Sequence, residues 1–296
     1  MVNFYIFVVA THFEGTLEAL VESLEKTLGF NINNFKILGY GVKWENFNTK
    51  IQILLNALNK CNDDDIIISC DAYDVLYDFR KSFETLKLKF FQANKDLIFS
   101  VTDMSRKNIP LKIYYKKVFC GLDKFNNEIG VNGGTYIGKC VAMRSILEEM
   151  SRLSEFDAKD DERSFNIILN SYPYDDVGNS YLYRNFRIGL DLKKVFFNVD
   201  LRFSDNVYDM ISNFMENYKV PKDTFDTYDS FFHHFLFYQD SSDLCRYHGL
   251  TPRKTYSSWA FKRFWHYFSY FKGDIEIIYI VIIAFIYFLF IIKIFK

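Results

Sequence analysis

Residues 66–74 read Ile-Ile-Ile-Ser-Cys-Asp-Ala-Tyr-Asp, an apolar run that ends in two aspartates. A short uncharged run of this kind is typical of a strand buried on both faces of a sheet. Strand patterns also occur at residues 5–9, 35–39 and 96–101, and helical patterns at residues 16–28, 48–60 and 79–93. This alternation predicts an α/β fold with a parallel sheet covered by helices on both faces.

Asp71 and Asp74 follow the apolar run directly. In open α/β sheets, ligands bind at the carboxyl ends of the strands, so we expect both carboxylates at a functional edge. Two carboxylates three residues apart can share one Mg²⁺ or Mn²⁺, which prefer oxygen ligands and often bind substrate phosphates too. The alternative is structural: either aspartate could cap the following segment or pair with a lysine.

Three later segments carry candidate polar groups. Asn132-Gly133-Gly134 predicts a glycine-rich turn that enters a strand, where two glycines allow close backbone approach to a ligand, although a plain hairpin is the alternative. Asp160-Asp161-Glu162 begins a predicted helix, where acids also act as caps. His248, before Gly249, could add an imidazole to the same metal, although a single histidine is more often structural.

Composition excludes some function classes. The chain has 296 residues, with 36 Lys and Arg against 37 Asp and Glu, a formal net charge of −1. Non-specific nucleic-acid binding needs a basic surplus, so we expect no nucleic-acid partner. Hydrophobic residues at 49% and charged residues at 25% are typical of a globular chain, which excludes global disorder.

The C-terminal part has a different composition. Residues 277–292 are uncharged and apolar on every side, which predicts a transmembrane helix over residues 275–295. Residues 257–274 are rich in aromatic and basic side chains, as in a membrane-interface segment. More basic residues precede the span than follow it. The positive-inside rule therefore predicts a single-pass, tail-anchored protein with its catalytic domain, residues 1–256, in the cytosol.

Taken in order, the motifs resemble the glycosyltransferase domain of the procollagen lysyl hydroxylase family and its procollagen galactosyltransferase-like relatives. The resemblance covers about residues 3–256. The matching segments are Val9-Ala10-Thr11, residues 38–44, Lys50, ISCDAYDVLY, LIFSVTD, VNGGTYIG, Asp160-Asp161-Glu162, Gly189-Leu190-Asp191 with VFFNV, and His248-Gly249 with Pro252 and Lys254.

The resemblance implies a GT-A-like, Rossmann-like nucleotide-binding fold with a mixed sheet and helices on both faces. It also implies roles for particular residues. The metal ligands would be Asp71, Asp74 and His248, holding Mn²⁺ or Mg²⁺; the nucleotide and diphosphate would meet Thr11, Trp44, Lys50, Tyr73, Gly133, Gly134, Gly249 and Lys254; and the catalytic candidates at the sugar and acceptor would be Asp160, Asp161 and Asn132.

The implied activity is a metal-dependent transfer of glucose or galactose from a UDP-sugar to a protein or glycan hydroxyl. Hydroxylysine of a collagen-like protein is one such acceptor. Two positions depart from the family pattern: the HGNG turn reads His248-Gly249-Leu250-Thr251, and Glu162 stands where an amide is usual. The alternative function is therefore a catalytically inactive, sugar-nucleotide-binding relative that acts as a membrane scaffold.

Overall fold

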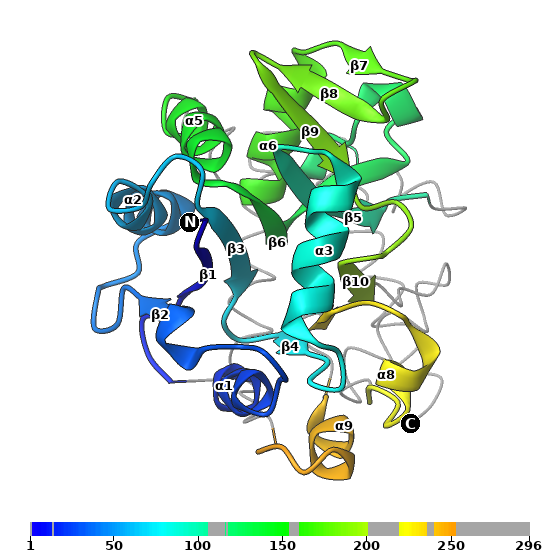
Figure 1. Cartoon of the computed structure of the whole chain (residues 1–296). Coiled ribbons are helices and arrows are strands. Elements are labelled where there is room, and N and C mark those ends of the chain that lie inside the picture. The colour runs from blue at the N-terminus through cyan, green and yellow to red at the C-terminus, as the bar shows by residue number, and fades with distance from the viewer. Residues whose placement is uncertain are drawn as a thin grey trace, which may run out of the picture.

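The computed structural model describes residues 2–13, 15–105, 116, 118–153, 160–200, 219–235 and 240–252. Its described part contains an eight-stranded sheet in the order β2-β1-β3-β6-β5-β9-β8-β7 (Figure 1). These strands are β1 (Phe4–Val9), β2 (Phe35–Leu38), β3 (Ile66–Asp71), β5 (Leu97–Asp103), β6 (Ile129–Lys139), β7 (Tyr174–Asp175), β8 (Ser180–Tyr183) and β9 (Phe186–Leu190).

The sheet is mixed. β1 pairs in parallel with β2 and β3, and β5 pairs in parallel with β9, whereas β6 runs antiparallel to both β3 and β5. The wholly parallel sheet expected from the strand–helix alternation is therefore wrong at β6, which runs antiparallel to both of its neighbours. The α/β fold with a mixed sheet is consistent with the GT-A type that the resemblance implied.

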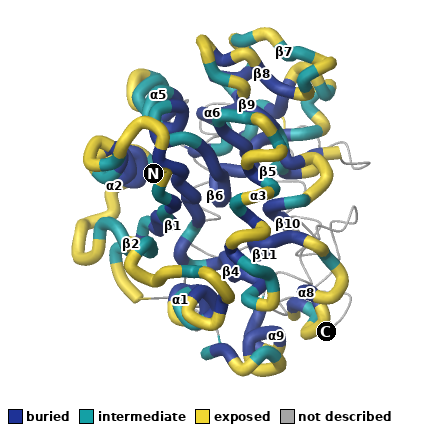
Figure 2. Tube along the Cα trace, in the orientation of Figure 1, coloured by how far each residue is buried: buried dark blue, intermediate teal, exposed yellow. Residues whose placement is uncertain are grey.

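Helices cover both faces of the sheet, as expected. One hydrophobic core lies under α2 (Phe47–Leu58), α5 (Cys140–Met150) and α6 (Asp161–Asn170), and a second lies under α1 (Leu17–Glu25) and α3 (Phe83–Ala93). Neighbouring residues of one strand divide between the two cores: Ile67 belongs to the first, and Ile66 and Ile68 to the second. The central strands are accordingly buried along their length (Figure 2).

A smaller sheet lies beside the main one, in the order β10-β11-β4. Its strands are β4 (Val75–Tyr77), β10 (Phe197–Asp200) and β11 (Phe232–Phe235). Along the chain, the short helix α8 (Thr224–Thr227) lies between β10 and β11, and α9 (Ser242–Tyr247) follows β11. β11 pairs antiparallel with β4, so that His234 stands opposite Val75. This pairing brings a late segment of the chain next to the end of β3.

Asp191 fixes the segment that leads into β10. It is 5% exposed, and its carboxylate accepts hydrogen bonds from the backbone N–H groups of Val195, Phe196 and Phe197, at 2.8, 2.7 and 2.8 Å. Burial raises the pKa of Asp191, although these three donors act against the rise. Asp191 therefore holds β10 where it can pair with β11.

We expect Asp191→Ala to lower the free energy of unfolding by about 2 to 4 kcal/mol, because it leaves buried N–H donors without an acceptor. Urea denaturation of both proteins measures this loss. The matched control is Asp243→Ala, which removes an exposed carboxylate paired with Arg246 and should cost less than about 1 kcal/mol. Equal losses for the two variants would contradict the part assigned to Asp191.

The predicted juxtamembrane segment, residues 257–274, and the predicted anchor, residues 275–295, lie outside the described residues. Within the ranges that are described, none of the helices combines the length and the hydropathy needed to cross a bilayer.

Candidate functional site

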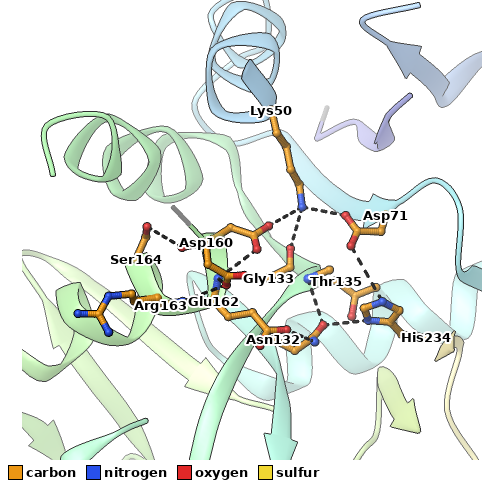
Figure 3. A network of polar contacts seen from close by, with 12 residues as sticks. Lys50, Asp71, Asn132, Gly133, Thr135, Asp160, Glu162, Arg163, Ser164 and His234 are labelled. Carbon is orange, nitrogen blue, oxygen red and sulfur yellow. Dashed lines mark hydrogen bonds and ion pairs between the residues drawn. The ribbon is translucent and has the colours of Figure 1, made fainter. Parts of the chain in front are cut away.

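Three possible metal ligands meet at the carboxyl end of β3. Asp71, Asp74 and His234 each offer one ligand atom, and these atoms lie within 4.8 Å of one another. His234 Nε2 is 3.4 Å from Asp74 Oδ1 and 4.0 Å from Asp71 Oδ2. Asp74 and His234 are 6% and 5% exposed. The three side chains therefore face one small, largely buried space, and we call them the metal group; Figure 3 shows Asp71 and His234.

Each ligand is placed by a different element. Asp71 is the last residue of β3, and Asp74 precedes β4. His234 comes from β11, where the backbone N–H of Phe235 donates to the Asp74 carbonyl at 2.7 Å. The antiparallel pairing of β11 with β4 thus sets the imidazole beside Asp74. Carboxylate oxygens with one imidazole nitrogen suit Mn²⁺ or Mg²⁺, so the residues present fit the divalent cation that the resemblance implies.

The structure brings His234 to this group instead of His248. The His248 ring lies near the end of α9, with its centroid 4.8 Å from that of Phe225 and 6.0 Å from that of Phe79. Burial lowers the pKa of His248. His248 therefore does not join Asp71 and Asp74, because its ring lies among those of Phe79 and Phe225.

Sequence reasoning missed His234, and one signal was available. The chain reads Phe231-Phe232-His233-His234-Phe235, so two adjacent imidazoles interrupt an aromatic strand. Alternation in a strand sends neighbouring side chains to opposite faces. His233 accordingly enters the core, where burial lowers its pKa to about 4, and His234 faces the metal group.

Gly133 and Gly134 do not form the predicted turn; both lie inside β6. The β5–β6 register shifts from Phe99 opposite Tyr136 to Ser100 opposite Asn132, so residues 133–135 bulge out of that pairing. A Cβ on Gly134 would lie 2.3 Å from His234 Cε1 and 2.9 Å from Asp71 Oδ2. One on Gly133 would lie 2.5 Å from Asp161 Cγ. The glycines therefore leave room for the metal group and for Asp161.

We expect Gly134→Ala to weaken Mn²⁺ binding by about tenfold or more, because the added methyl group displaces His234 or Asp71. Isothermal titration of Mn²⁺ measures the effect. Gly189→Ala is the matched control, since its Cβ would meet first the flexible side chain of Lys95, at 3.0 Å. An unchanged dissociation constant in Gly134→Ala would show that His234 and Asp71 do not hold the ion together.

Lys50 reaches from α2 into the same space. Its ammonium donates to Asp161 Oδ2 at 2.6 Å, to Asp71 Oδ1 at 2.8 Å and to the Gly133 carbonyl at 3.2 Å. Burial acts to lower the pKa of Lys50, but the two carboxylates outweigh it and raise that pKa well above its usual value. Burial raises the pKa of Asp71, and Lys50 opposes this rise. Lys50 thus joins the metal group to the start of α6.

Asp160 and Asp161, at the start of α6, have different roles. Asp160 is the N-cap, and its Oδ1 accepts from the backbone N–H groups of Glu162 and Arg163, at 2.9 and 3.4 Å. Asp161 points to Lys50 and is 8% exposed. The capping interpretation therefore fits Asp160, while Asp161 lies in the site.

Asn132 lies between the metal group and α6 and is 1% exposed. Its Oδ1 is 3.0 Å from His234 Nδ1, and its Nδ2 donates to Glu162 Oε1 at 2.6 Å. Asn132 therefore touches a possible metal ligand on one side and Glu162 on the other.

Three predicted nucleotide contacts lie at the carboxyl edge of β1 to β3. The Tyr73 hydroxyl accepts from the backbone N–H of Thr11 at 3.0 Å, and its ring centroid is 5.3 Å from that of His12. Trp44 lies in the segment between β2 and α2, where it is 44% exposed and packs edge-on against Phe47. Of these residues, Tyr73 lies between Asp71 and Asp74 in the chain, and Trp44 offers an exposed aromatic ring.

The two remaining predicted contacts are Gly249 and Lys254. Gly249 follows α9 with a φ of 63°, and its carbonyl accepts from Lys26 Nζ at 2.6 Å. Lys254 lies outside the described residues.

Comparison with known proteins gives one family match. The family described as the PLOD GT domain matches residues 1–220. No curated protein matches the sequence. Among 63 matching chains of solved structures is the crystal structure of A197 from STIV, which is 16% identical. It aligns over 62% of this chain and 92% of that chain with a TM-score of 0.32, which is too low to support any argument.

Proposed function

The chain belongs to the PLOD GT domain family, a family of glycosyltransferase domains, and from this membership we propose that it moves a hexose from a UDP-sugar to a hydroxyl group with the help of a divalent cation. The resemblance to the procollagen lysyl hydroxylase glycosyltransferase domain is thereby confirmed at the level of the family. The observation that carries the proposal is the metal group, Asp71, Asp74 and His234, placed against the Lys50–Asp161 ion pair.

The charges of the site support a reaction that expels a nucleoside diphosphate. When bound by Asp71, Asp74 and His234, Mn²⁺ or Mg²⁺ would supply positive charge to the departing diphosphate. Lys50 holds Asp71 from the opposite side, through Oδ1, while Asp71 Oδ2 faces His234. This arrangement fixes the carboxylate before the substrate arrives, so less reorganisation is needed during the reaction.

Asp161 is our candidate for stabilising the positive charge that develops on the transferred sugar. Its carboxylate already accepts from Lys50 Nζ and from the backbone N–H of Glu162, at 2.6 and 3.1 Å. Two donors hold it in a fixed orientation beside the metal group. We therefore assign Asp161 to electrostatic stabilisation.

The donor would lie along the edge formed by Thr11, Trp44 and Tyr73. Aromatic rings suit the stacking of a base, and the hydrogen bond from the Thr11 N–H fixes the Tyr73 hydroxyl. UDP-glucose and UDP-galactose are the donors that we propose, with Lys254 near the diphosphate.

A cavity of about 470 Å³ is the candidate position for the acceptor. Its lining includes Val101, Asp103 and Glu128. Val101 and Asp103 belong to β5, the strand next to β6, which carries Asn132. The proposed acceptor is a protein or glycan hydroxyl, including hydroxylysine of a collagen-like protein.

The test is UDP release by the full chain with Mn²⁺, UDP-glucose or UDP-galactose, and peptides with and without hydroxylysine. We expect release that depends on both the metal and one acceptor. Tight UDP binding without release over the whole panel would favour the alternative, an inactive sugar-nucleotide-binding relative. Absence of UDP binding with Mn²⁺ would contradict both.

We also propose a membrane tether through residues 275–295, with residues 1–256 on the cytosolic side. The uncharged run at 277–292 and the basic residues before it support this orientation. Protease protection in sealed microsomes tests it. Digestion of residues 1–256 by protease added outside the microsomes agrees with the proposal, whereas protection of these residues contradicts it.

A further inference from the structure

A chain of side chains runs from the start of α6 to the metal group. Glu162 accepts a hydrogen bond from Asn132 Nδ2 at 2.6 Å, and Asn132 Oδ1 lies 3.0 Å from His234 Nδ1 (Figure 3). The other ring nitrogen, Nε2, faces Asp74 and Asp71 at 3.4 and 4.0 Å. Asn132 and His234 are 1% and 5% exposed, so water has little access to this contact.

The orientation of the Asn132 amide is determined at both ends. A carboxylate has no hydrogen to donate, so the atom that faces Glu162 must be the amide nitrogen. On the opposite side, the backbone N–H of Gly134 donates to Oδ1 at 3.0 Å. A backbone N–H cannot accept, so the atom there must be the oxygen. A flipped amide would fail at both ends.

This orientation selects one tautomer of the neutral His234 ring. Because Asn132 Oδ1 can only accept, His234 Nδ1 must carry a hydrogen and donate it to that oxygen. In the neutral ring, Nε2 then has a lone pair, and it points toward Asp71 and Asp74. A histidine whose second nitrogen donates to a fixed acceptor is the usual form of a metal ligand.

We propose that Asn132 and Glu162 are positioning residues for the metal: Glu162 fixes the Asn132 amide, and Asn132 fixes His234 with Nε2 directed at the cation. The inference rests on the proposed function, because it concerns the cation of that site. It assigns Asn132 a role through His234, in place of the catalytic role expected from the sequence. It also gives Glu162 a part in metal binding.

The first test measures the ring without metal. In the full chain, ¹⁵N shifts of His234 should report hydrogen on Nδ1. Asn132→Leu removes the acceptor, and we expect the signal to move toward the form with hydrogen on Nε2. The control is Gln92→Leu, which removes an exposed amide of α3 and should leave the shifts unchanged. An unaltered chain with hydrogen on Nε2 alone, or no change in Asn132→Leu, overturns the inference.

The second test measures Mn²⁺ affinity by electron paramagnetic resonance. Loss of such an outer contact typically weakens metal binding by about 10- to 100-fold, which we expect for Asn132→Leu and for Asn132→Asp. In Asn132→Asp, the new carboxylate lies next to that of Glu162, and the two repel each other. Adding Glu162→Gln restores a donor and returns the charge of the pair to its original value. The double variant should therefore bind Mn²⁺ within about threefold of the unaltered chain.

The outcomes separate the two proposals. Failure of the unaltered chain to bind Mn²⁺ overturns the proposed function, and the positioning role with it. If the unaltered chain binds Mn²⁺ and Asn132→Leu binds it equally well, the inference alone is overturned. A double variant that stays as weak as Asn132→Asp also overturns it, because the loss then does not depend on the direction of the hydrogen bond.

Discussion

Asp74→Ala is expected to lower the turnover of the full chain by about 10²- to 10³-fold, the size of effect seen when one fixed group that stabilises transition-state charge is removed. Asp74 is 6% exposed and lies 3.4 Å from His234 Nε2, so its loss opens one side of the metal group. It is a cleaner target than Asp71, which also balances the charge of Lys50. The measurement is UDP release at saturating donor over a range of Mn²⁺ concentrations.

The control for Asp74→Ala is Asp64→Ala, which removes an exposed carboxylate just before β3 and should leave turnover unchanged. Partial rescue of Asp74→Ala by high Mn²⁺ would agree with a weakened metal site. If Asp74→Ala and Asp71→Ala both retain full turnover, the assignment of the metal ligands is wrong.

Lys50→Met should lower the free energy of unfolding by about 3 to 5 kcal/mol at pH 7.5, because it leaves the buried Asp161 and the half-buried Asp71 without their cation. Lys50 opposes the rise that burial imposes on the pKa of Asp71, so the variant raises this pKa further. A carboxyl group with a raised pKa in the folded state binds more protons there than in the unfolded state. Stability is then lost as the pH rises from the pKa of Asp71 in the unfolded state through its higher pKa in the folded state. The loss in free energy of unfolding caused by Lys50→Met should therefore be smaller at pH 5 than at pH 7.5.

Urea denaturation at the two pH values measures this trend. The matched control is Lys139→Met, which breaks the ion pair with Asp96 near the surface, where the lysine is 41% exposed. That variant should cost less than about 1 kcal/mol. A deficit for Lys50→Met that grows from pH 7.5 to pH 5 would contradict the role given to Lys50.

The sequence was sufficient to predict the elements that depend on local pattern. The apolar run before Asp71 became β3, and the helical patterns before and after it became α1, α2 and α3 within a few residues. Asp71 and Asp74 converge as expected, because their positions depend on a single strand end. Lys50 was expected at the nucleotide, and the structure shows that it contacts Asp71 and Asp161, which spacing along the chain does not reveal.

The features that were missed depend on pairing between distant segments. His234 reaches the metal group because β11 pairs with β4, and periodicity along one strand does not reveal its partner. Gly133 and Gly134 were predicted to form a turn, since two adjacent glycines usually interrupt a strand. Their place in β6 follows from the register shift opposite β5, which leaves space for His234 and Asp161.

The most direct test of the metal centre is anomalous diffraction from crystals of the full chain grown with Mn²⁺ and UDP. We predict one strong anomalous peak bounded by Asp71, Asp74 and His234 Nε2, at coordination distance from all three. The same peak should be absent in Asp74→Ala. A peak bounded by His248, or no peak at the end of β3 while UDP is bound, would contradict the metal group described above.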